Sequence, residues 1–412
     1  MDPWTHPHPP RDGEGGLRRL AVLGAGPVGL DAALAARASG FRLRVYEAAP
    51  VPAGHVRAWG HVRLFTPWEM NVSHRMRQGL QEAGKPLRVD EKARPTGHEL
   101  VDRVMDPLWR LSGLRESLHT RTEVVAVGRQ GTLKHEEIGG GRRLHRPFRV
   151  LLQGGDGREW VEYADVVLDC TGTWGNPNTL GDGGIPAPGE RQLDDRIQRM
   201  IPELPRERNV WGGKTILLAG AGHSAQTAAR ALSELAESVP DTRVLWLLRS
   251  EDLSLGAVEN DPLPGRRELT RRASALVQGA SPAIQALPGR VVDALCPVGK
   301  EVEVRLARRD GARETIRVDR ILSLTGGVGD HQLYRQLQVH ECYATSGPMK
   351  LAAALLGGGE ADCLNQESHG AEALSNPEPS FYLLGDKSYG RNNTFLLRTG
   401  WEQVDEIFGA MD

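Results

Sequence analysis

The sequence predicts an α/β protein of two similar halves, each built on an open parallel sheet with a three-stranded β-meander. The first observation is a glycine turn, Gly24 to Gly29, directly after the apolar run Leu20 to Leu23. A second turn, Gly220 to Ala225, follows the apolar run Thr215 to Ala219. In both, a strand leads into a glycine-rich turn that opens a helix, which is the pattern of Rossmann-like dinucleotide-binding domains. The later elements also repeat in the same order, and such self-similarity is a signal for the whole fold.

Each small residue in these turns has a physical task. The first glycine makes the turn, the second lets the backbone approach a phosphate, and the third small residue lets helix and strand pack closely. The N-terminus of the following helix attracts the anion. One dinucleotide is therefore expected at each turn. The residues expected to contact it are Gly24, Gly26 and Gly29 in the first turn, and Gly220, Gly222, Ser224 and Ala225 in the second.

The elements after each turn distinguish the two nucleotides. A helix over 31–39 and a strand ending at Glu47 follow the first turn, and an acid at this spacing accepts hydrogen bonds from an adenosine ribose. A helix over 224–237 and a strand ending at Arg249 follow the second turn. A cation there suits a ribose 2′-phosphate and predicts NADPH rather than NADH. Because the chain has 44 Arg and 7 Lys, an ordinary exposed arginine is the alternative interpretation of Arg249.

The rest of the first half is expected to be irregular over 51–97, where Pro and Gly are frequent, and more regular afterwards. A polar segment over 129–146 is expected to be a surface loop with His135 and His145 in solvent. The expected elements are a helix over 99–111, strands over 123–127, 148–152 and 160–163, and a strand over 165–169 that leads into Thr171 and Gly172.

The second half repeats this order and then adds a C-terminal segment. That segment is a strand ending in Gly385 and Asp386, followed by a helix over 394–408 with Thr394 or Asn393 as its cap. The repeated strands are expected over 290–294, 302–306 and 315–318, with a fourth over 320–325.

Composition excludes several classes of function. A length of 412 residues is enough for two domains, and a net charge of −2 gives no overall attraction to nucleic acid or anionic membrane. No apolar run approaches the roughly 18 residues of a membrane span. Residues 1–16 resemble a disordered leader without an apolar core, which together with the composition predicts a cytoplasmic protein. Four cysteines, Cys170, Cys296, Cys342 and Cys363, are too few for a disulfide framework.

Four stretches of the sequence, in their order along the chain, resemble motifs of the flavoproteins with two dinucleotide-binding domains. This family includes thioredoxin reductase-type disulfide reductases and flavin monooxygenases. The resemblance implies FAD at the first turn, NADPH at the second, and an FAD domain interrupted by the NADPH domain. The implied parts are a leader over 1–16, FAD-binding segments over 17–205 and 331–412, and an NADPH-binding domain over 206–330. The four stretches are Gly24 to Gly29 with Glu47, Cys170 to Gly172, Gly220 to Ala225 with Arg249, and Tyr382 to Asp386.

The same resemblance assigns roles around the flavin. Asp386 would contact the ribityl chain, and the C-terminal helix would point its N-terminus at the pyrimidine edge of the isoalloxazine, where its partial positive charge stabilises the reduced ring. Lys387 or Arg391 would add positive charge, with a solvated loop as the alternative for both. A second candidate segment spans 59–71, where aromatic side chains would wall the flavin and exclude water. There Arg63, Trp68 and Asn71, with His74 nearby, are candidates for contacts to flavin or substrate, and a packed loop core anchored by Trp68 is the alternative.

The motifs leave three functions open. The Gly220 to Ala225 turn matches flavin N-hydroxylases, whereas Ile185 to Glu190 resembles the linker of disulfide reductases, yet no CxxC or CxxxxC pair occurs. The favoured function is an FAD- and NADPH-dependent monooxygenase that attacks a small amine or sulfur nucleophile through a C4a-peroxyflavin. The alternatives are a reductase that passes electrons to a quinone, thiol or protein acceptor, and a flavoprotein that binds nucleotide without catalysis. A small-molecule substrate or acceptor, O₂ included, is expected, without nucleic acid, membrane or metal, and a homodimer stays open.

Overall fold

A computed structural model describes residues 17–111, 113–139, 141–357 and 369–411, and the chain divides into two compact units. Unit 1 consists of Met1–Gly60, Pro67–Asn176 and Val328–Asp412, and unit 2 of His61–Thr66 and Pro177–Gly327. Unit 1 is thus interrupted by unit 2, in agreement with the expected fold class. The boundary expected at 205–206 falls inside unit 2. The segment 1–16 and Cys363 lie outside the described residues.

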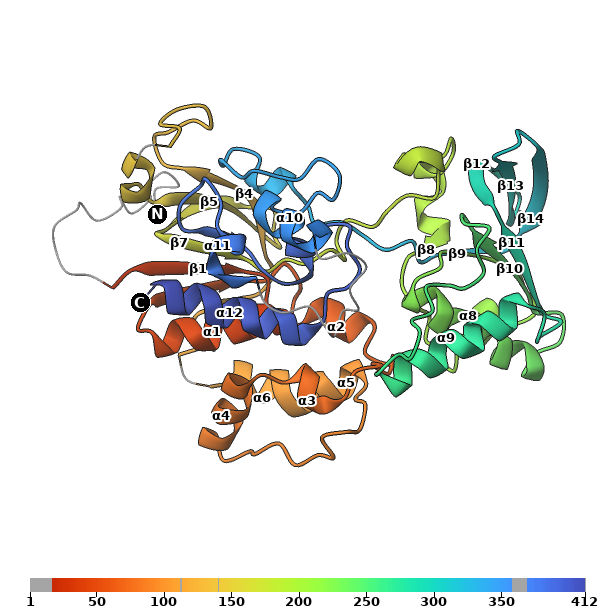
Figure 1. Cartoon of the computed structure of the whole chain (residues 1–412), viewed down its shortest axis with the longest axis horizontal. Helices are drawn as coiled ribbons and strands as arrows, with labels where there is room; N and C mark the ends of the chain where they lie inside the picture. Colours follow the sequence, from red (N-terminus) through yellow and green to blue (C-terminus); the bar gives the residue numbers. More distant parts are fainter. Residues whose placement is uncertain (1–16, 112, 140, 358–368, 412) are drawn as a thin grey trace. The chain divides into compact units, whose positions relative to one another are not determined.

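Unit 1 contains a five-stranded sheet in the order β16-β7-β1-β2-β3, and every neighbouring pair is parallel. Helices α1 and α12 cover one face, and the antiparallel meander β4-β5-β6 covers the other (Figure 1). The strands are β1 (Arg19–Leu23), β2 (Arg42–Tyr46), β3 (Leu118–His119), β4 (Thr122–Arg129), β5 (Phe148–Gly154), β6 (Glu159–Ala164), β7 (Val166–Asp169) and β16 (Phe381–Leu383).

Helices of unit 1 include several in the stretch over 51–97 that was expected to be irregular. This expectation was wrong because local caps outweigh the Pro and Gly content: the Ser73 hydroxyl accepts a hydrogen bond from the Met76 N–H and starts α4. The helices are α1 (Pro27–Ala38), α2 (Gly54–Ala58), α3 (Trp68–Asn71), α4 (His74–Glu82), α5 (Gly97–Leu100), α6 (Asp106–Trp109), α10 (Met349–Gly357), α11 (Gly370–Leu374) and α12 (Leu397–Met411).

The expected helix over 99–111 forms as α5 and α6 joined by a π-helical turn, η1 (Val101–Met105). It begins at a capping box between Thr96 and Glu99. The C-terminal helix starts at Leu397, so neither Asn393 nor Thr394 caps it. Thr394 instead donates its N–H and its hydroxyl to the Asn392 side chain, at 3.0 and 2.7 Å. The 3₁₀ turns of unit 1 are η2 (Gly141–His145), η5 (Gln332–Tyr334) and η6 (Gly385–Tyr389).

Unit 2 repeats the architecture, with a five-stranded sheet in the order β11-β10-β9-β15-β8. Helices α8 and α9 pack on one face and the meander β12-β13-β14 on the other (Figure 1). The strands are β8 (Ile197–Gln198), β9 (Thr215–Ala219), β10 (Arg243–Leu248), β11 (Ile284–Pro288), β12 (Arg290–Val298), β13 (Glu301–Arg308), β14 (Arg313–Val318) and β15 (Arg320–Ser323). The helices are α7 (Arg208–Trp211), α8 (His223–Ser238) and α9 (Pro264–Val277), with 3₁₀ turns η3 (Asp182–Gly184) and η4 (Arg191–Arg196).

None of the helices in the described part of the chain is long and apolar enough to cross a membrane.

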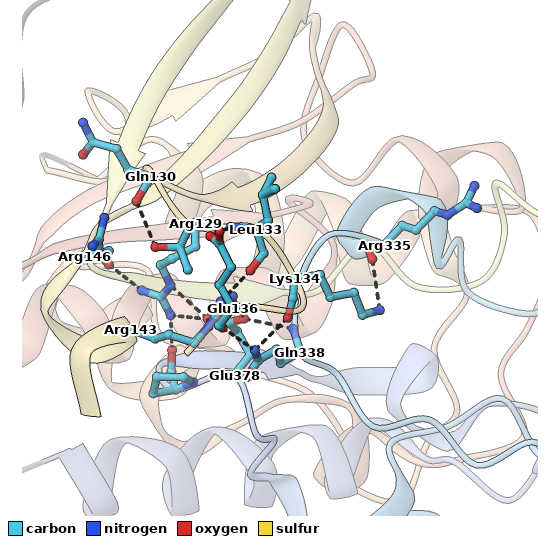
Figure 2. A network of polar contacts seen from close by, with 12 residues as sticks. Arg129, Gln130, Leu133, Lys134, Glu136, Arg143, Arg146, Arg335, Gln338 and Glu378 are labelled. Carbon is cyan, nitrogen blue, oxygen red and sulfur yellow. Dashed lines mark hydrogen bonds and ion pairs between the residues drawn. The ribbon is translucent and has the colours of Figure 1, made fainter. Parts of the chain in front are cut away.

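The polar segment over 129–146 carries a buried ion-pair network that the sequence did not reveal (Figure 2). Arg129 and Arg143, both buried, hold the Glu378 carboxylate between them, at 2.8 and 2.6 Å. The N–H of Gln338 donates a further hydrogen bond to Glu378 at 2.9 Å. His135 and His145 are exposed, as expected. The segment therefore fixes the chain just before β16 and also forms a surface loop. We call the contact of Arg129 and Arg143 with Glu378 the Glu378 clamp.

Charge and hydrogen bonding fix the ionisation of Glu378. Burial raises the pKa of its carboxyl, but the hydrogen bonds from Arg143 and Gln338 and the charge of Arg129 outweigh burial, so that the pKa lies below its ordinary value of 4.5. The ionised Glu378 carboxylate thus stabilises the folded state at pH values above its ordinary pKa of 4.5. This contribution is lost as the pH falls through the lower folded-state pKa.

We expect Glu378→Gln to lower the free energy of unfolding of unit 1 by about 3–5 kcal/mol at pH 7, because two buried guanidinium groups lose their counter-charge. Urea denaturation at pH 7 and near pH 3.5 measures this, and the gap to the wild type should narrow at the lower pH. Glu303→Gln, which removes a partly exposed partner of Arg317 on β13, is the control and should change little. Equal stability of the two variants would contradict the clamp.

Candidate functional site

The candidate site of unit 1 lies where the carboxyl ends of its parallel strands meet. Ligands of open α/β sheets bind at this edge, at the topological switch point, where later strands are added on opposite sides of one strand. Here that strand is β1, with β2 on one side and β7 on the other. The residues that follow the four strands β1, β2, β7 and β16 are Gly24 to Gly29, Glu47, Cys170 to Thr173 and Gly385 to Lys387.

The first glycine turn has the geometry of a phosphate cradle. Gly24 has φ of +92°, and a Cβ there would lie 2.8 Å from the carbonyl oxygen of Cys170. A Cβ on Gly29 would lie 2.0 Å from the Gly24 carbonyl oxygen, so both positions exclude a side chain. A Cβ on Gly26 meets nothing within 4 Å. Gly26 begins α1 without a side-chain cap from the described residues, so the N–H groups of the first turn face the space beside it.

Glu47 is held by the backbone at the next strand end. Its two carboxylate oxygens accept hydrogen bonds from the N–H groups of Ala25 (2.8 Å) and Ala49 (2.9 Å). Each oxygen keeps a further lone pair for a ribose hydroxyl. The carboxylate borders a pocket of about 310 Å³ whose lining also includes Gly54, His55 and Arg57. A pocket of this volume with an oriented carboxylate fits the adenosine side of a dinucleotide.

Two carboxylates, Asp169 and Asp386, lie at the carboxyl ends of β7 and β16, each with a hydrogen-bond partner. The Thr173 hydroxyl donates to Asp386 at 2.5 Å. Burial raises the pKa of the Asp386 carboxyl, and the hydrogen bond from Thr173 partly offsets this. Gly172, at φ of +71°, has open space beside it, whereas burial raises the pKa of the neighbouring Cys170 thiol. Because the Cys170 thiol is buried and its ionisation is disfavoured, we interpret Cys170 as a packing residue.

Lys387 is fully buried, which rules out the solvated-loop alternative for this residue. Its ammonium group lies 2.6 Å from an oxygen of Asp169 and 3.0 Å from the Thr171 hydroxyl. The other Asp169 oxygen accepts hydrogen bonds from the Thr171 N–H and hydroxyl. The ring of Tyr334 lies over the ammonium group, 5.1 Å from it. Arg391, in contrast, is exposed.

The second glycine turn, in unit 2, repeats the first. Gly220 has φ of +124°, and a Cβ there would lie 2.2 Å from the Leu324 carbonyl oxygen. A Cβ on Gly222 meets nothing within 4 Å, and Gly222 begins α8 without a side-chain cap from the described residues. Ala225 is fully buried beneath the turn, and Ser224 is half-buried. The two units therefore present equivalent anion cradles.

Arg249 follows β10 and is exposed, one strand away from the second turn. Several other arginines of unit 2 have carboxylate partners. Arg266 is buried and bonds Asp261 at 2.7 and 2.8 Å, and Arg271 and Arg272 both pair with Glu268. Arg249 is thus the cation at the strand end next to this cradle.

The four candidate catalytic residues are divided between the two units. Arg63 is exposed and belongs to unit 2, whereas the other three belong to unit 1. Trp68 is 3% exposed in α3 with the Arg103 guanidinium over its ring, which is what the packed-core alternative predicts. Asn71 ends the same helix and donates to the Pro67 carbonyl at 2.8 Å. Lys387 lies instead with Asp169 and Thr171.

Sequence reasoning missed Asp169 and Tyr334. A carboxylate at the buried end of β7 needs a cationic partner, and this was the signal for Asp169. Tyr334 lies in a short 3₁₀ turn with no periodic pattern around it.

No protein-family model matches the chain, and no curated protein matches it. Solved structures do match over nearly its whole length. Bacillithiol disulfide reductase Bdr (YpdA) from Bacillus cereus is 18% identical with a TM-score of 0.68, over 96% of this chain and 99% of that chain. The cadaverine monooxygenase DfoA from Erwinia amylovora, bound to FAD, is 12% identical with a TM-score of 0.64, over 95% and 94%. The ornithine N-hydroxylase KtzI from Kutzneria sp. 744, with reduced FAD and NADP⁺, is 16% identical with a TM-score of 0.62, over 96% and 99%.

The chain therefore has the fold of the flavoproteins with two dinucleotide-binding domains, as the resemblance implied. Both disulfide reductases and N-hydroxylases share this fold, so it does not select a reaction.

Proposed function

We propose that this protein is an FAD-containing, NADPH-dependent oxidoreductase, and that its reaction is the monooxygenation of a small amine or sulfur nucleophile. The observation that carries the proposal is the pair of equivalent cradles at Gly26 and Gly222, one beside an oriented acid and the other beside an exposed cation. An acid suits the ribose hydroxyls of FAD, and a cation suits the 2′-phosphate of NADPH. The FAD and NADP⁺ in structures of the same fold agree with this assignment.

The FAD site would be formed by residues of unit 1 alone. The N–H groups at the start of α1 would hold the pyrophosphate, Glu47 the ribose hydroxyls, and Thr171, Gly172, Gly385 and Asp386 the ribityl side. Bound FAD would supply a carrier that takes a hydride from NADPH and reacts with O₂ or another acceptor. The backbone must supply much of the binding, because Gly24 and Gly29 exclude side chains from the turn.

Lys387 would neutralise Asp169 and orient Thr171 rather than contact the substrate. Its ammonium group is paired with Asp169 and bonded to Thr171, so it orients the residue that precedes the open backbone of Gly172. We propose that Trp68 and Asn71 support this arrangement through α3, which packs on α12. The indole N–H of Trp401 in α12 donates to the Met70 carbonyl at 3.3 Å and links the two helices.

The three described cysteines favour oxygenation over disulfide reduction. A disulfide reductase of this fold needs two thiols close together, and all three described cysteines are free. Cys170 is buried and directly follows β7, Cys296 is on β12 of unit 2, and Cys342 is in the loop before α10. These positions offer no dithiol among the described residues.

A reductase that passes electrons to a planar acceptor such as a quinone is the second candidate. A stack of aromatic rings in unit 1 favours it: the Trp174 ring lies 6.5 Å from His55 and 6.2 Å from Trp59, nearly parallel to both. Trp174 is 41% exposed and directly follows Thr173, the partner of Asp386. An exposed aromatic face of this kind can bind a flat ring.

Mixing the NADPH-reduced protein with O₂ in a stopped-flow spectrometer tests the reaction class. A monooxygenase is expected to accumulate a long-lived absorbing species that is neither the reduced nor the oxidised flavin spectrum. Direct return to the oxidised spectrum, together with fast turnover of a quinone, would instead identify the reductase. A flavin that NADPH does not reduce would leave only nucleotide binding without catalysis.

The two cradles make a matched pair of variants. Gly26→Val should yield folded but colourless protein, because a Cβ there meets no protein atom within 4 Å, while the side chain would occupy the space of the pyrophosphate. Gly222→Val should stay yellow and lose binding of NADPH. Absorbance spectra, circular dichroism and calorimetry with NADP⁺ measure these outcomes. Full FAD occupancy in Gly26→Val would overturn the assignment of the first site.

Arg249→Ala should raise the apparent KM for NADPH about ten- to a hundredfold and leave that for NADH nearly unchanged. The reason is the loss of a charge-assisted hydrogen bond to the 2′-phosphate, worth on the order of 1.5–3 kcal/mol. Arg272→Ala is the control, since Arg272 is an exposed arginine of the same unit that pairs with Glu268. A wild type that prefers NADH, or an Arg249→Ala variant that keeps its preference for NADPH, would refute this assignment.

A further inference from the structure

The segment His61–Thr66 lies within unit 2 although it is part of the N-terminal third of the chain. The chain leaves unit 1 after Gly60 and re-enters it at Pro67. Val62 packs against the core cluster to which the buried residues of α8 and α9 belong, and Thr66 is 6% exposed. The sequence suggested a wall for the flavin here, whereas these contacts are made with the unit that carries the second glycine turn.

Phe65 contacts that turn directly. Its ring centroid lies 4.9 Å from the ring centroid of His223, with the two planes tilted by 55°. His223 is the first residue of α8 and follows Gly222, beside which the cradle is open. A side chain from a distant part of the sequence therefore borders the place where a dinucleotide would be held.

His223 contributes an uncharged ring at neutral pH. Burial lowers the pKa of its imidazole, the nearby Arg266 guanidinium lowers it further, and Asp261 only partly opposes this. Arg266 and Asp261 form a buried ion pair with each other, 2.7 Å apart. Phe65 and His223 together form an aromatic face beside an anion cradle, and flat rings and apolar edges of a ligand pack well on such a face.

We propose that His61–Thr66 is part of the dinucleotide site of unit 2, with Phe65 and His223 as an aromatic face that packs against the bound pyridine nucleotide. This inference rests on the proposed binding of NADPH at the second turn and adds a segment that the glycine motif does not contain. Because both ends of the segment continue into unit 1, the nucleotide would contact a part of the chain that is covalently anchored in the flavin-binding unit. Phe65 is a nucleotide-binding residue in this proposal.

Calorimetric titration of the FAD-loaded protein with NADP⁺ tests the proposal without turnover. Phe65→Ala is expected to raise the Kd for NADP⁺ about 2- to 10-fold, the loss typical of one aromatic contact, while Phe65→Tyr, which keeps the ring, binds like the wild type. Val298→Ala, a change at an exposed apolar residue on β12 of the same unit, is the matched control and should have no effect. Hydrogen exchange in the wild type should slow at the amides of 62–66 when NADP⁺ is added.

An unchanged Kd in Phe65→Ala, with flavin content and circular dichroism equal to the wild type, would overturn the proposal. If Phe65→Ala fails to fold, the hydrogen-exchange measurement on the wild type decides, and exchange at 62–66 that does not respond to NADP⁺ refutes it. Failure of the proposed function looks different, because the wild type would then not bind NADP⁺ at all. Binding that depends on Arg249 but not on Phe65 would remove only the role of this segment.

Discussion

The parallel pairing of β16 with β7 is the interaction on which the site of unit 1 depends. It brings Asp386 to Thr173 and Lys387 to Asp169, and the second pair joins residues 218 positions apart. The strand β16 has only three residues, so its own hydrogen bonds are few. The Glu378 clamp just before it, held by two arginines of the β4–β5 region, compensates for this shortness. The C-terminal part of the candidate site is thus held by buried charges as well as by the sheet.

Local sequence signals predicted what depends on local geometry. Both glycine turns, the strands that feed them and both meanders form as expected, since steric exclusion at Gly24 and Gly220 and alternating apolar patterns act within a few residues. The strand ends at Glu47 and Arg249 could be predicted for the same reason. Repetition of these signals in two halves made the fold class predictable without any relative of known structure.

Features that depend on distant partners could not be predicted. Lys387 follows Asp386 in a segment rich in polar residues, and nothing local tells that its ammonium group is buried against Asp169. The polar 129–146 segment contains two arginines that are buried partners of Glu378, so the polarity of these two residues did not mean solvation. The six residues 61–66 carry no periodic pattern, and their membership of unit 2 depends on contacts with residues about 160 positions away.

The interruption of unit 1 by unit 2 has a consequence for how the chain folds during synthesis. The sheet of unit 1 lacks β16, and the Arg129–Arg143 pair lacks its carboxylate, until residues 378–383 have left the ribosome. Unit 2 is continuous from Pro177 to Gly327, and its short segment His61–Thr66 is synthesised before that, so all of unit 2 is available earlier. Because contacts distant in sequence form slowly and domains generally fold as units, unit 2 would fold first and unit 1 would wait for the C-terminus. A truncated chain ending before Glu378 would retain a folded unit 2 beside an incomplete, aggregation-prone sheet.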